Sequence, residues 1–365
     1  MATALVFVLC AIAVSHTNGL REPPEGLVIP PEYADELQKI VDGTAADEPA
    51  PSAEEAPSVQ VWPSEDVPFG QIGGIAVDTD GNVHVFHRGS RVWNEDSFNE
   101  KNVFKHVSDG PIKEPTHVVL DGDTGELLAA MGEDTYYMPH GLTVDQHGNH
   151  WMTDVAMHQV FKIPAGEEKP SIVLGEKFVP GSDNAHFCKP TDVAVASTGE
   201  FFVGDGYCNS RIIKFAPDGT FITSFGKPTP ATLAPPAVGS FQVPHSVALV
   251  EAWNMLCVAD RENERIQCFT AGLNHDGKTL PSGIPLKSAN NLGRVFAIRA
   301  KDHYLYGVTN MGEEGGENEI FKVDLRTGDA VTETPGLTNP HCIAVTDDET
   351  VYVGEVGPNQ ILKIE

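Results

Sequence analysis

The sequence predicts an all-β protein with a six-bladed β-propeller fold, and a repeat of short strands is the main reason. Equivalent apolar runs are 51, 54, 51 and 45 residues apart, counted from His140 through Thr191, His245 and Phe296 to His341. The strands alternate in polarity, and Gly, Asn and Asp fill the turns between them. A closed ring of six units leaves few exposed sheet edges, and a sandwich or a solenoid explains this spacing less easily.

Each unit reads as an apolar strand, an aromatic-rich strand with an Asp or Gly, and a strand with Ile or Phe beside Lys or Arg. In a propeller the first of these strands lines the central channel. The innermost strands are expected around Ile75, His140, Thr191, His245, Phe296 and His341. The second strands are expected around Val83, Trp151, Phe201, Leu256, Leu305 and Val351. Third strands are expected around Gln159, Arg211, Arg265, Glu319 and Gln360.

The last unit ends at Glu365 after three strands, so its outermost strand must come from elsewhere. Just before the first unit, Ser58–Trp62 alternates polar and apolar residues and is followed by Pro63. Proline suits the end of an edge strand because it lacks an N–H to donate. We expect 58–62 to pair with the C-terminal strand and close the ring; the alternative is that this segment continues the preceding arm.

Three regions are expected along the chain. Residues 1–19 resemble a signal peptide, because the apolar run Ala4–Val14 has 11 residues, too few to span a bilayer. Residues 20–56 are rich in Glu, Pro and Ala and are expected to form a flexible acidic arm. Residues 57–365 form the propeller domain. The protein should therefore be secreted or lie in the lumen of the secretory pathway.

The formal net charge of −28 argues against a nucleic-acid partner, since phosphate backbones attract basic surfaces. No Lys/Arg-rich run suggests a membrane-binding patch, and no later stretch is apolar enough to span a membrane. Such acidity commonly serves solubility alone. We expect a monomer.

Five cysteines remain after the leader, which agrees with an oxidising compartment. Cys257 and Cys268 lie symmetrically about the turn Arg261–Glu264, so they face each other across a hairpin. Cys188 precedes the first strand of one unit and Cys208 follows its second strand, so these two form a plausible second bridge. The predicted pairs are Cys188–Cys208 and Cys257–Cys268, and Cys342 is left over.

Three Pro-His dipeptides open the runs PHGLTVD, PHSVALV and PHCIAVT, at His140, His245 and His341. They fall in the second, fourth and sixth units, so equivalent side chains lie about 120° apart around the axis of a six-bladed ring. Three converging imidazoles leave one coordination position open, which is the arrangement of a catalytic zinc site. The alternative is that Pro-His is simply turn sequence at the start of a blade.

Seven longer motifs are specific enough to compare with known families: FHRGSRVW (86–93), YMPHGLTVD (137–145), WMTDVAMHQVFK (151–162), PGSDNAHFCKPTDVAV (180–195), VGDGYCNSRI (203–212), VPHSVAL (243–249) and CVADRENERIQCF (257–269). Together they resemble peptidyl-α-hydroxyglycine α-amidating lyase, the second catalytic half of the peptide-amidating monooxygenase, an NHL-type propeller. The resemblance runs from about Gly70 to the C-terminus, and nothing resembles the copper monooxygenase half. It therefore implies a free-standing lyase that follows a separate peptidylglycine hydroxylase.

The resemblance implies a zinc-dependent lyase that cleaves a C-terminal peptidyl-α-hydroxyglycine to the peptide amide and glyoxylate. Arg88 and Arg261 match the two active-site arginines of the family and would bind the substrate carboxylate. Tyr207 matches the proposed base, and nearby positive charge would favour its phenolate. Each has a plain alternative: Arg88 as a surface ion-pair partner, Arg261 as a turn residue, and Tyr207 as part of a blade core.

Two departures from the family pattern concern a calcium site and the wall of the active site. The family binds calcium through backbone carbonyls that match Ile75 and Leu142 and through an aspartate that is Cys342 here. Calcium prefers hard oxygen ligands, so a thiol should weaken or abolish the site. A family methionine is Asn339 here, which makes the substrate-binding wall more polar.

Two other functions compete with the lyase. One is a non-catalytic secreted propeller, derived from the lyase and retained as a binding protein; it should have lost zinc histidines, arginines or the tyrosine. The other is a calcium-dependent lactonase, which needs acidic and amide metal ligands in the channel. Release of glyoxylate with and without a chelator distinguishes all three.

Overall fold

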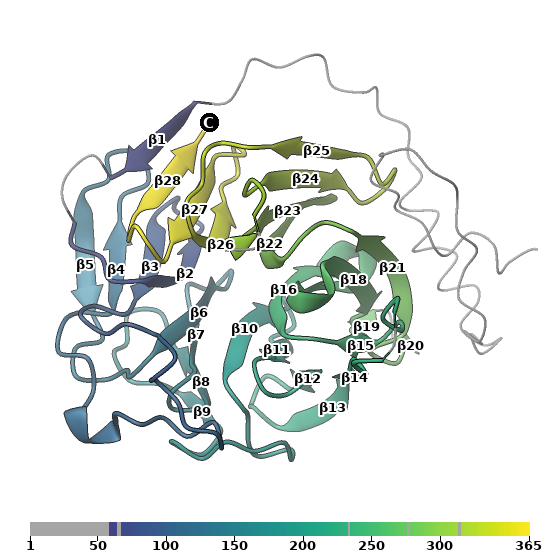
Figure 1. Ribbon diagram of the computed structural model, residues 1–365, viewed down its shortest axis with the longest axis horizontal. Helices are drawn as coiled ribbons and strands as arrows, with labels where there is room; N and C mark the ends of the chain where they lie inside the picture. The colour runs from purple at the N-terminus through teal and green to yellow at the C-terminus, as the bar shows by residue number, and fades with distance from the viewer. Residues whose placement is uncertain (1–57, 64–66, 233, 276–277, 313–314) are drawn as a thin grey trace, which may run out of the picture.

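The predicted six-bladed β-propeller is confirmed. The computed structural model describes residues 58–63, 67–232, 234–275, 278–312 and 315–365, so the expected leader (1–19) and arm (20–56) lie outside the described residues. Six four-stranded antiparallel sheets surround a central axis like the blades of a fan (Figure 1). In blades 1 to 5 the innermost strand comes first in the chain. In blade 6 the outermost strand, β1, comes first and the other three strands come from the end of the chain.

The first three blades follow one another directly along the chain. Blade 1 is β2 (Ile72–Val77), β3 (Val83–His87), β4 (His117–Leu120) and β5 (Leu127–Met131). Blade 2 is β6 (Pro139–Val144), β7 (His150–Asp154), β8 (Gln159–Ile163) and β9 (Ile172–Leu174). Blade 3 is β10 (Pro190–Val195), β11 (Phe201–Asp205), β12 (Arg211–Phe215) and β13 (Phe221–Phe225).

The last three blades complete the ring. Blade 4 is β16 (Pro244–Val250), β17 (Met255–Asp260), β18 (Arg265–Thr270) and β21 (Pro285–Asn290). Blade 5 is β22 (Val295–Lys301), β23 (Tyr304–Thr309), β24 (Ile320–Asp324) and β25 (Ala330–Glu333). Blade 6 is β26 (Pro340–Val345), β27 (Val351–Glu355), β28 (Ile361–Ile364) and β1 (Val59–Trp62).

Short accessory elements decorate the connections between the main strands. Two small two-stranded pairs are β14 (Lys227–Pro228) with β15 (Ser240–Phe241), and β19 (Asn274–His275) with β20 (Lys278–Thr279). Three 3₁₀ turns are η3 (Val107–Asp109), η4 (Glu251–Trp253) and η5 (Arg261–Asn263). Among the described residues, no helix has the length and apolar character that crossing a membrane requires.

The hydrophobic core lies between neighbouring blades, because each sheet packs a face against the next. One cluster joins Trp151 of blade 2 to Phe201 and Phe215 of blade 3, with the first two rings 4.4 Å apart. Another joins Val85 of blade 1 to Tyr352 of blade 6. Large side chains on alternate strand positions thus fill the wedge between sheets, which explains the aromatic-rich second strands.

The N-terminal segment closes the ring as predicted. Strand β1 pairs antiparallel with β28, from Val59 opposite Ile364 to Trp62 opposite Ile361. Ser58 and Glu365 exchange both backbone hydrogen bonds, at 2.9 and 3.1 Å. Trp62 is buried against the ring of Tyr352 at 4.9 Å, so this strand contributes a core side chain as well as hydrogen bonds.

Both predicted disulfides are present, Cys188–Cys208 and Cys257–Cys268. The second joins directly opposed residues of β17 and β18, as the symmetric hairpin required. Among the described cysteines, Cys342 is free and buried.

No third strand was predicted for blade 1, because a connection of unusual length separates β3 from β4. This segment, residues 88–116, carries no regular strand and contains only the short turn η3. It begins with Arg88 and includes Trp93, and both side chains reach the centre of the ring. The long loop is therefore part of the functional site.

Candidate active site

The three Pro-His strands share one local structure. Each proline is the first residue of an innermost strand, where its missing N–H costs nothing. In each strand the pairing register shifts just after the proline, so the histidine lies in a bulge. A bulge turns a side chain out of the regular alternation. The histidines at these bulges are His140 in β6, His245 in β16 and His341 in β26.

A buried carboxylate fixes the chain that leads into each histidine. Asp154, at the end of β7, accepts hydrogen bonds from the backbone N–H of Tyr137 and Met138 at 2.7 and 2.8 Å. Asp260 accepts one from Gln242 in the same way at 2.7 Å. In blade 6 the carboxylate is a glutamate instead: Glu355 accepts from Thr338 and Asn339 at 2.6 and 2.9 Å. These carboxylates are fully buried and anchor the entering loops.

The histidine rings meet on the axis, with ring centres 4.8 to 5.0 Å apart. Each Nδ1 donates a hydrogen bond to a backbone carbonyl of the next blade around the ring. A carbonyl can only accept, so Nδ1 carries the proton and Nε2 keeps its lone pair. For His140, His245 and His341 the acceptors are Thr191, Phe296 and Gly73, at 2.7, 2.5 and 3.0 Å.

Two glycines allow the blades to approach closely enough for these hydrogen bonds. A Cβ at Gly73 would lie 2.6 Å from the carbonyl oxygen of Pro139. A Cβ at Gly141 would lie 2.4 Å from the oxygen of Thr191, the acceptor for His140. A larger residue at either position would push the neighbouring blades apart and move the histidines.

Tyr207 completes the cluster, with its hydroxyl 2.9 Å from Nε2 of both His140 and His245. A phenol has one proton, so it can donate to only one of these two lone pairs. Burial lowers the pKa of His140 to about 3 and the pKa values of His245 and His341 well below the usual range, so the rings are neutral. Three buried, neutral imidazoles whose Nε2 atoms keep their lone pairs fit a divalent cation such as zinc.

The pKa of Tyr207 is raised by burial, while the positive charges of Arg261 and Arg88 act to lower it. The two guanidinium groups alone thus do not offset burial. The predicted phenolate would need a further positive charge beside the hydroxyl.

Arg88 is buried, so the alternative of a surface ion pair is wrong. Its side chain is 3% exposed; Nε donates to the Pro139 carbonyl at 3.0 Å and Nη1 donates to Gln71 at 2.8 Å. Its Nη2 is buried and has no hydrogen-bond partner among the described residues. Burial lowers the pKa of Arg88 to about 10, which still leaves the group charged at neutral pH. A buried cation with a spare donor is suited to an anionic ligand.

Arg261 lies in η5, directly after β17, and its guanidinium faces the same centre. The guanidinium carbon is 5.3 Å from the ring centre of Tyr207 and 4.7 Å from that of Phe296. Its Nε donates to Glu262 at 2.7 Å, and Arg294 also binds that carboxylate. Glu262 therefore orients Arg261 without enclosing it.

The sequence analysis assigned no role to Trp93, which forms a wall of the site. Its ring centre is 4.7 Å from that of Tyr207 and 6.1 Å from that of His140, and the Arg88 guanidinium lies over it at 5.1 Å. Trp93 was within the motif FHRGSRVW, but an indole carries no acid–base signal. Gln71, which holds Arg88 and accepts from the Trp93 backbone N–H at 2.8 Å, was also missed.

Asn339 lies two residues before His341, at the start of blade 6. It is half-buried, and its side-chain oxygen accepts a hydrogen bond from Asn310 at 2.5 Å. Its predicted contact with substrate stays a prediction.

The residues expected to hold calcium do not fit that ion. The carbonyl of Leu142 accepts a hydrogen bond from Arg299 at 3.3 Å, and the same guanidinium binds Asp192 at 2.9 Å. Cys342 presents a sulfur 3.9 Å from the carbonyl oxygen of Ile72, where the family has a carboxylate. A guanidinium on one expected ligand would repel a divalent cation, and a thiol is a poor calcium ligand.

Comparison with known proteins identifies the family. An NHL repeat model matches residues 187–215. The probable peptidyl-α-hydroxyglycine α-amidating lyase of Caenorhabditis elegans is 44% identical over 91% of this chain and 92% of its own length. Lyase 2 of Drosophila melanogaster is 40% identical over 94% of this chain and 83% of its own length. The rat peptidylglycine α-amidating monooxygenase is 42% identical over 83% of this chain, but this match spans only 31% of that larger protein.

Solved structures agree on the fold alone. A putative gluconolactonase superposes with a TM-score of 0.53 at 12% identity, covering 85% of this chain and 92% of that one. The nidogen/laminin complex gives 0.52 at 16% identity, covering 75% and 84%. The similarity to the worm and fly enzymes extends over nearly the whole chain. This chain belongs to the peptidyl-α-hydroxyglycine α-amidating lyase family.

Proposed function

We propose that this protein is a zinc-dependent lyase that converts a C-terminal peptidyl-α-hydroxyglycine to the peptide amide and glyoxylate. The observation that carries the proposal is the Tyr207 hydroxyl, 2.9 Å from the Nε2 atoms of His140 and His245, beside two arginines. Membership of the lyase family supports the substrate class.

His140, His245 and His341 are the residues that would hold zinc, each through Nε2. Zinc bound there would supply a Lewis acid that polarises a substrate oxygen. The protein contributes the orientation of the rings, because three backbone carbonyls fix their tautomers and their rotation.

The substrate carboxylate binds the arginines in this proposal. The free Nη2 of Arg88 offers a buried, charged donor, and the guanidinium of Arg261 lies beside the Tyr207 ring. Trp93 packs beside both Arg88 and Tyr207 and would exclude water from the carboxylate. These contacts hold the hydroxyglycine carbon next to the Tyr207 oxygen.

Tyr207 moves the proton that the reaction must relocate. Its oxygen, as phenolate, accepts the proton of the substrate hydroxyl, and the electrons of that O–H bond form the aldehyde C=O. The C–N bond breaks, and its electron pair goes to the amide nitrogen. The phenol then returns the proton to nitrogen, so the products are a primary amide and glyoxylate, and the enzyme is regenerated.

The competing interpretation is a binding protein that has lost activity. It is disfavoured because the three histidines, both arginines and the tyrosine are all present and converge. A calcium-dependent lactonase is disfavoured by the histidine lining of the channel and by Arg299 on the Leu142 carbonyl. We propose that calcium is not a cofactor of this protein.

Its place in the cell is also a proposal. Two disulfides support passage through the secretory pathway, where such bonds persist. We propose that a peptidylglycine hydroxylase supplies the substrate by first oxidising the glycine α-carbon.

The test is release of glyoxylate from a peptide that ends in α-hydroxyglycine. We expect turnover that a chelator abolishes and that added zinc restores. The same peptide ending in glycine is the control and should not be cleaved. Absence of glyoxylate from the zinc-loaded protein would contradict the proposal.

A further inference from the structure

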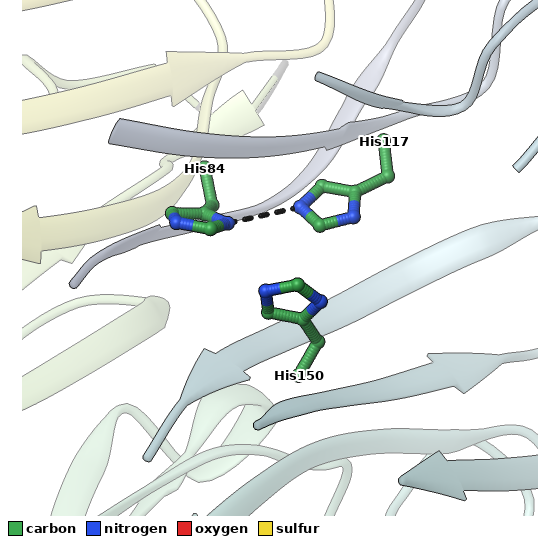
Figure 2. Close-up of side chains that lie close together, drawn as sticks. All are labelled: His84, His117 and His150. Carbon is green, nitrogen blue, oxygen red and sulfur yellow. Dashed lines mark hydrogen bonds between the residues drawn. The ribbon is translucent and has the colours of Figure 1, made fainter. Parts of the chain in front are cut away.

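A second cluster of three buried histidines lies away from the axis, between blades 1 and 2. His84 is in β3, His117 begins β4, and His150 begins β7. Figure 2 shows the three rings turned toward one another, two from one sheet and one from the sheet that faces it. One ring nitrogen of each lies within 4.8 Å of the others.

The strand register explains why these side chains share one space. Phe86 pairs directly with His117 across β3 and β4, and His84 is two residues from Phe86 on the same strand. Side chains at such positions lie on one face of a sheet. That face packs on blade 2, where His150 points back, so the ring centres are 4.8 to 5.3 Å apart.

The nitrogen atoms have the spacing of metal ligands. Nδ1 of His84 and Nε2 of His117 are 3.1 Å apart. Two nitrogens on a tetrahedral zinc ion, each about 2.0–2.1 Å from the metal, are separated by roughly 3.3 Å. A small adjustment of the rings would therefore admit the ion between them.

The third histidine has a buried ring nitrogen without a hydrogen-bond partner in the described part of the chain. His150 is only 8% exposed, and its Nδ1 is buried and has no hydrogen-bond partner among the described residues. Leaving such a polar atom unpaired costs free energy, on the order of 1–3 kcal/mol by general experience. Three buried rings this close cannot all carry charge, so lone pairs are available.

A carboxylate orients the first histidine from outside the cluster. Nε2 of His84 lies 3.2 Å from a carboxylate oxygen of Asp78. A carboxylate only accepts, so Nε2 carries the proton and Nδ1 faces His117 as a lone pair. A histidine held by a carboxylate through its second nitrogen is the usual outer shell of a metal ligand.

The same carboxylate connects the cluster to a path for cations. Asp78 lines a depression of about 600 Å³ at the end of the channel opposite the active site, together with Asp145, which follows β6. Seven carboxylate side chains and one lysine line this depression. Their negative potential would concentrate cations next to the cluster.

We propose that His84, His117 and His150 form a second metal site, which takes one divalent transition metal ion of the class that imidazole binds, with water as the fourth ligand. The ligand set of three imidazoles favours zinc, copper or nickel over calcium and magnesium. Binding replaces the hydrogen bond between His84 and His117. The proton that His117 Nε2 donates there moves to its Nδ1, so each ring stays neutral.

This metal has a different role from the one on the axis. The ligands come from two adjacent sheets, so the ion joins blade 1 to blade 2. The long loop that carries Arg88 and Trp93 starts at the end of β3 and returns at β4, the two strands that hold His84 and His117. The second ion therefore stabilises the blade from which this wall of the active site extends.

The test counts zinc per chain in the full-length protein, stripped with a chelator, reloaded with Zn²⁺ alone and desalted. We expect His150→Gln to remove one equivalent of zinc relative to wild type. The matched control is His147→Gln, an exposed histidine three residues away, which should remove none. Repeating both in a His245→Ala background makes the result independent of the axial site. Equal zinc in the His150→Gln and His147→Gln proteins would overturn the proposal.

A second measurement needs no variant and covers the case in which His150→Gln does not fold. Wild-type crystals soaked in micromolar Zn²⁺ should give an anomalous difference peak among the three rings at the zinc edge. A map without that peak, or with one only at millimolar Zn²⁺, would show that the cluster is hydrogen-bonded packing and would overturn the site.

Discussion

The two histidine clusters of this propeller are built from the same side chain in opposite ways. His140, His245 and His341 come from three alternate blades, and each lies in a bulge of an innermost strand. His84 and His117 come from one blade, in regular strand positions, and contact a third histidine on the adjacent blade. The axial rings bind backbone carbonyls, whereas the second cluster is held by contacts among its own rings and Asp78.

The difference teaches how surroundings determine what a histidine triad can do. On the axis, each Nδ1 donates its proton in a hydrogen bond to a backbone carbonyl, which leaves the Nε2 lone pairs free. Two arginines and a tyrosine lie beside these Nε2 atoms, so the site is arranged for reaction at an open position. Between the blades, the three rings are buried, and no described arginine is in hydrogen-bond contact with them. Such a site can fix structure but offers no means of binding an anionic substrate.

The largest effect that separates the clusters should be on turnover. His245→Ala removes an axial ligand, and we expect kcat/KM to fall at least about 10³-fold, since a metal supplies several kcal/mol of transition-state stabilisation. His150→Gln should stay within about twofold of wild type. Glyoxylate release measures both. Equal losses in the two variants would erase the functional distinction between the clusters.

Tyr207→Phe sharpens the comparison by removing the proton carrier that only the axial cluster has. We expect kcat to fall about 10²–10⁴-fold, the usual cost of losing a general acid–base group. Zinc content and the circular dichroism spectrum should match wild type, because the phenyl ring still packs on Trp93. Activity within a few-fold of wild type would show that another group moves the proton.

Arg88→Ala should weaken binding of the substrate carboxylate. Loss of a charge-assisted hydrogen bond typically costs about 1.5–3 kcal/mol, so we expect kcat/KM to fall about 10²-fold. Arg88→Lys keeps the charge but not the planar fork that holds Pro139 and Gln71, and it should recover only part of the loss. Full recovery by lysine would mean that charge alone matters at this position.

Stability, rather than activity, should report on ring closure. Truncation through Pro57 should be nearly silent, whereas truncation through Pro63 removes β1 and the buried Trp62. Four edge residues and one large side chain amount to about 5 kcal/mol, or roughly 10 °C in melting temperature. Thermal unfolding of both proteins tests this; identical melting temperatures would also contradict a domain boundary near residue 57.

The smallest effect should come from calcium. Arg299 already binds the Leu142 carbonyl, and Cys342 stands where a carboxylate would be needed. Adding millimolar Ca²⁺ to chelator-treated protein should shift the melting temperature by less than about one degree, while Zn²⁺ should raise it by several degrees. A calcium shift as large as the zinc shift would show that oxygen ligands remain available.

The repeat made most of the fold predictable. Short alternating strands at regular spacing indicate a propeller, and the missing fourth strand at Glu365 pointed to β1 because an open sheet edge must be covered. Blade 1 was incompletely predicted, since the connection from His87 to His117 is long and the periodic signal is lost across it. Strand starts were displaced by up to three residues, as at β2, which begins at Ile72 and not at Ile75.

The active-site residues that could be predicted are those that lie in a recognisable sequence motif. His140, His245 and His341 share a Pro-His motif, and Tyr207 and the two arginines lie in long motifs of the family. Nothing in the sequence indicated a role for Trp93 or Gln71, because their roles depend on how a loop folds over the ring. Asp154 was visible as a strand-ending aspartate, but only the structure shows that it binds the loop that enters the histidine.

The sequence by itself determined the number of blades, the disulfides, the closing strand and the axial histidines, because each depends on spacing along one chain. Only the tertiary structure decided what lies across the gaps between sheets. His84, His117 and His150 have no common motif and become neighbours because two twisted sheets pack face to face. The guanidinium of Arg299 reaches Leu142 from 157 residues away for the same reason. Contacts between blades depend on the exact packing of side chains, which periodicity does not encode.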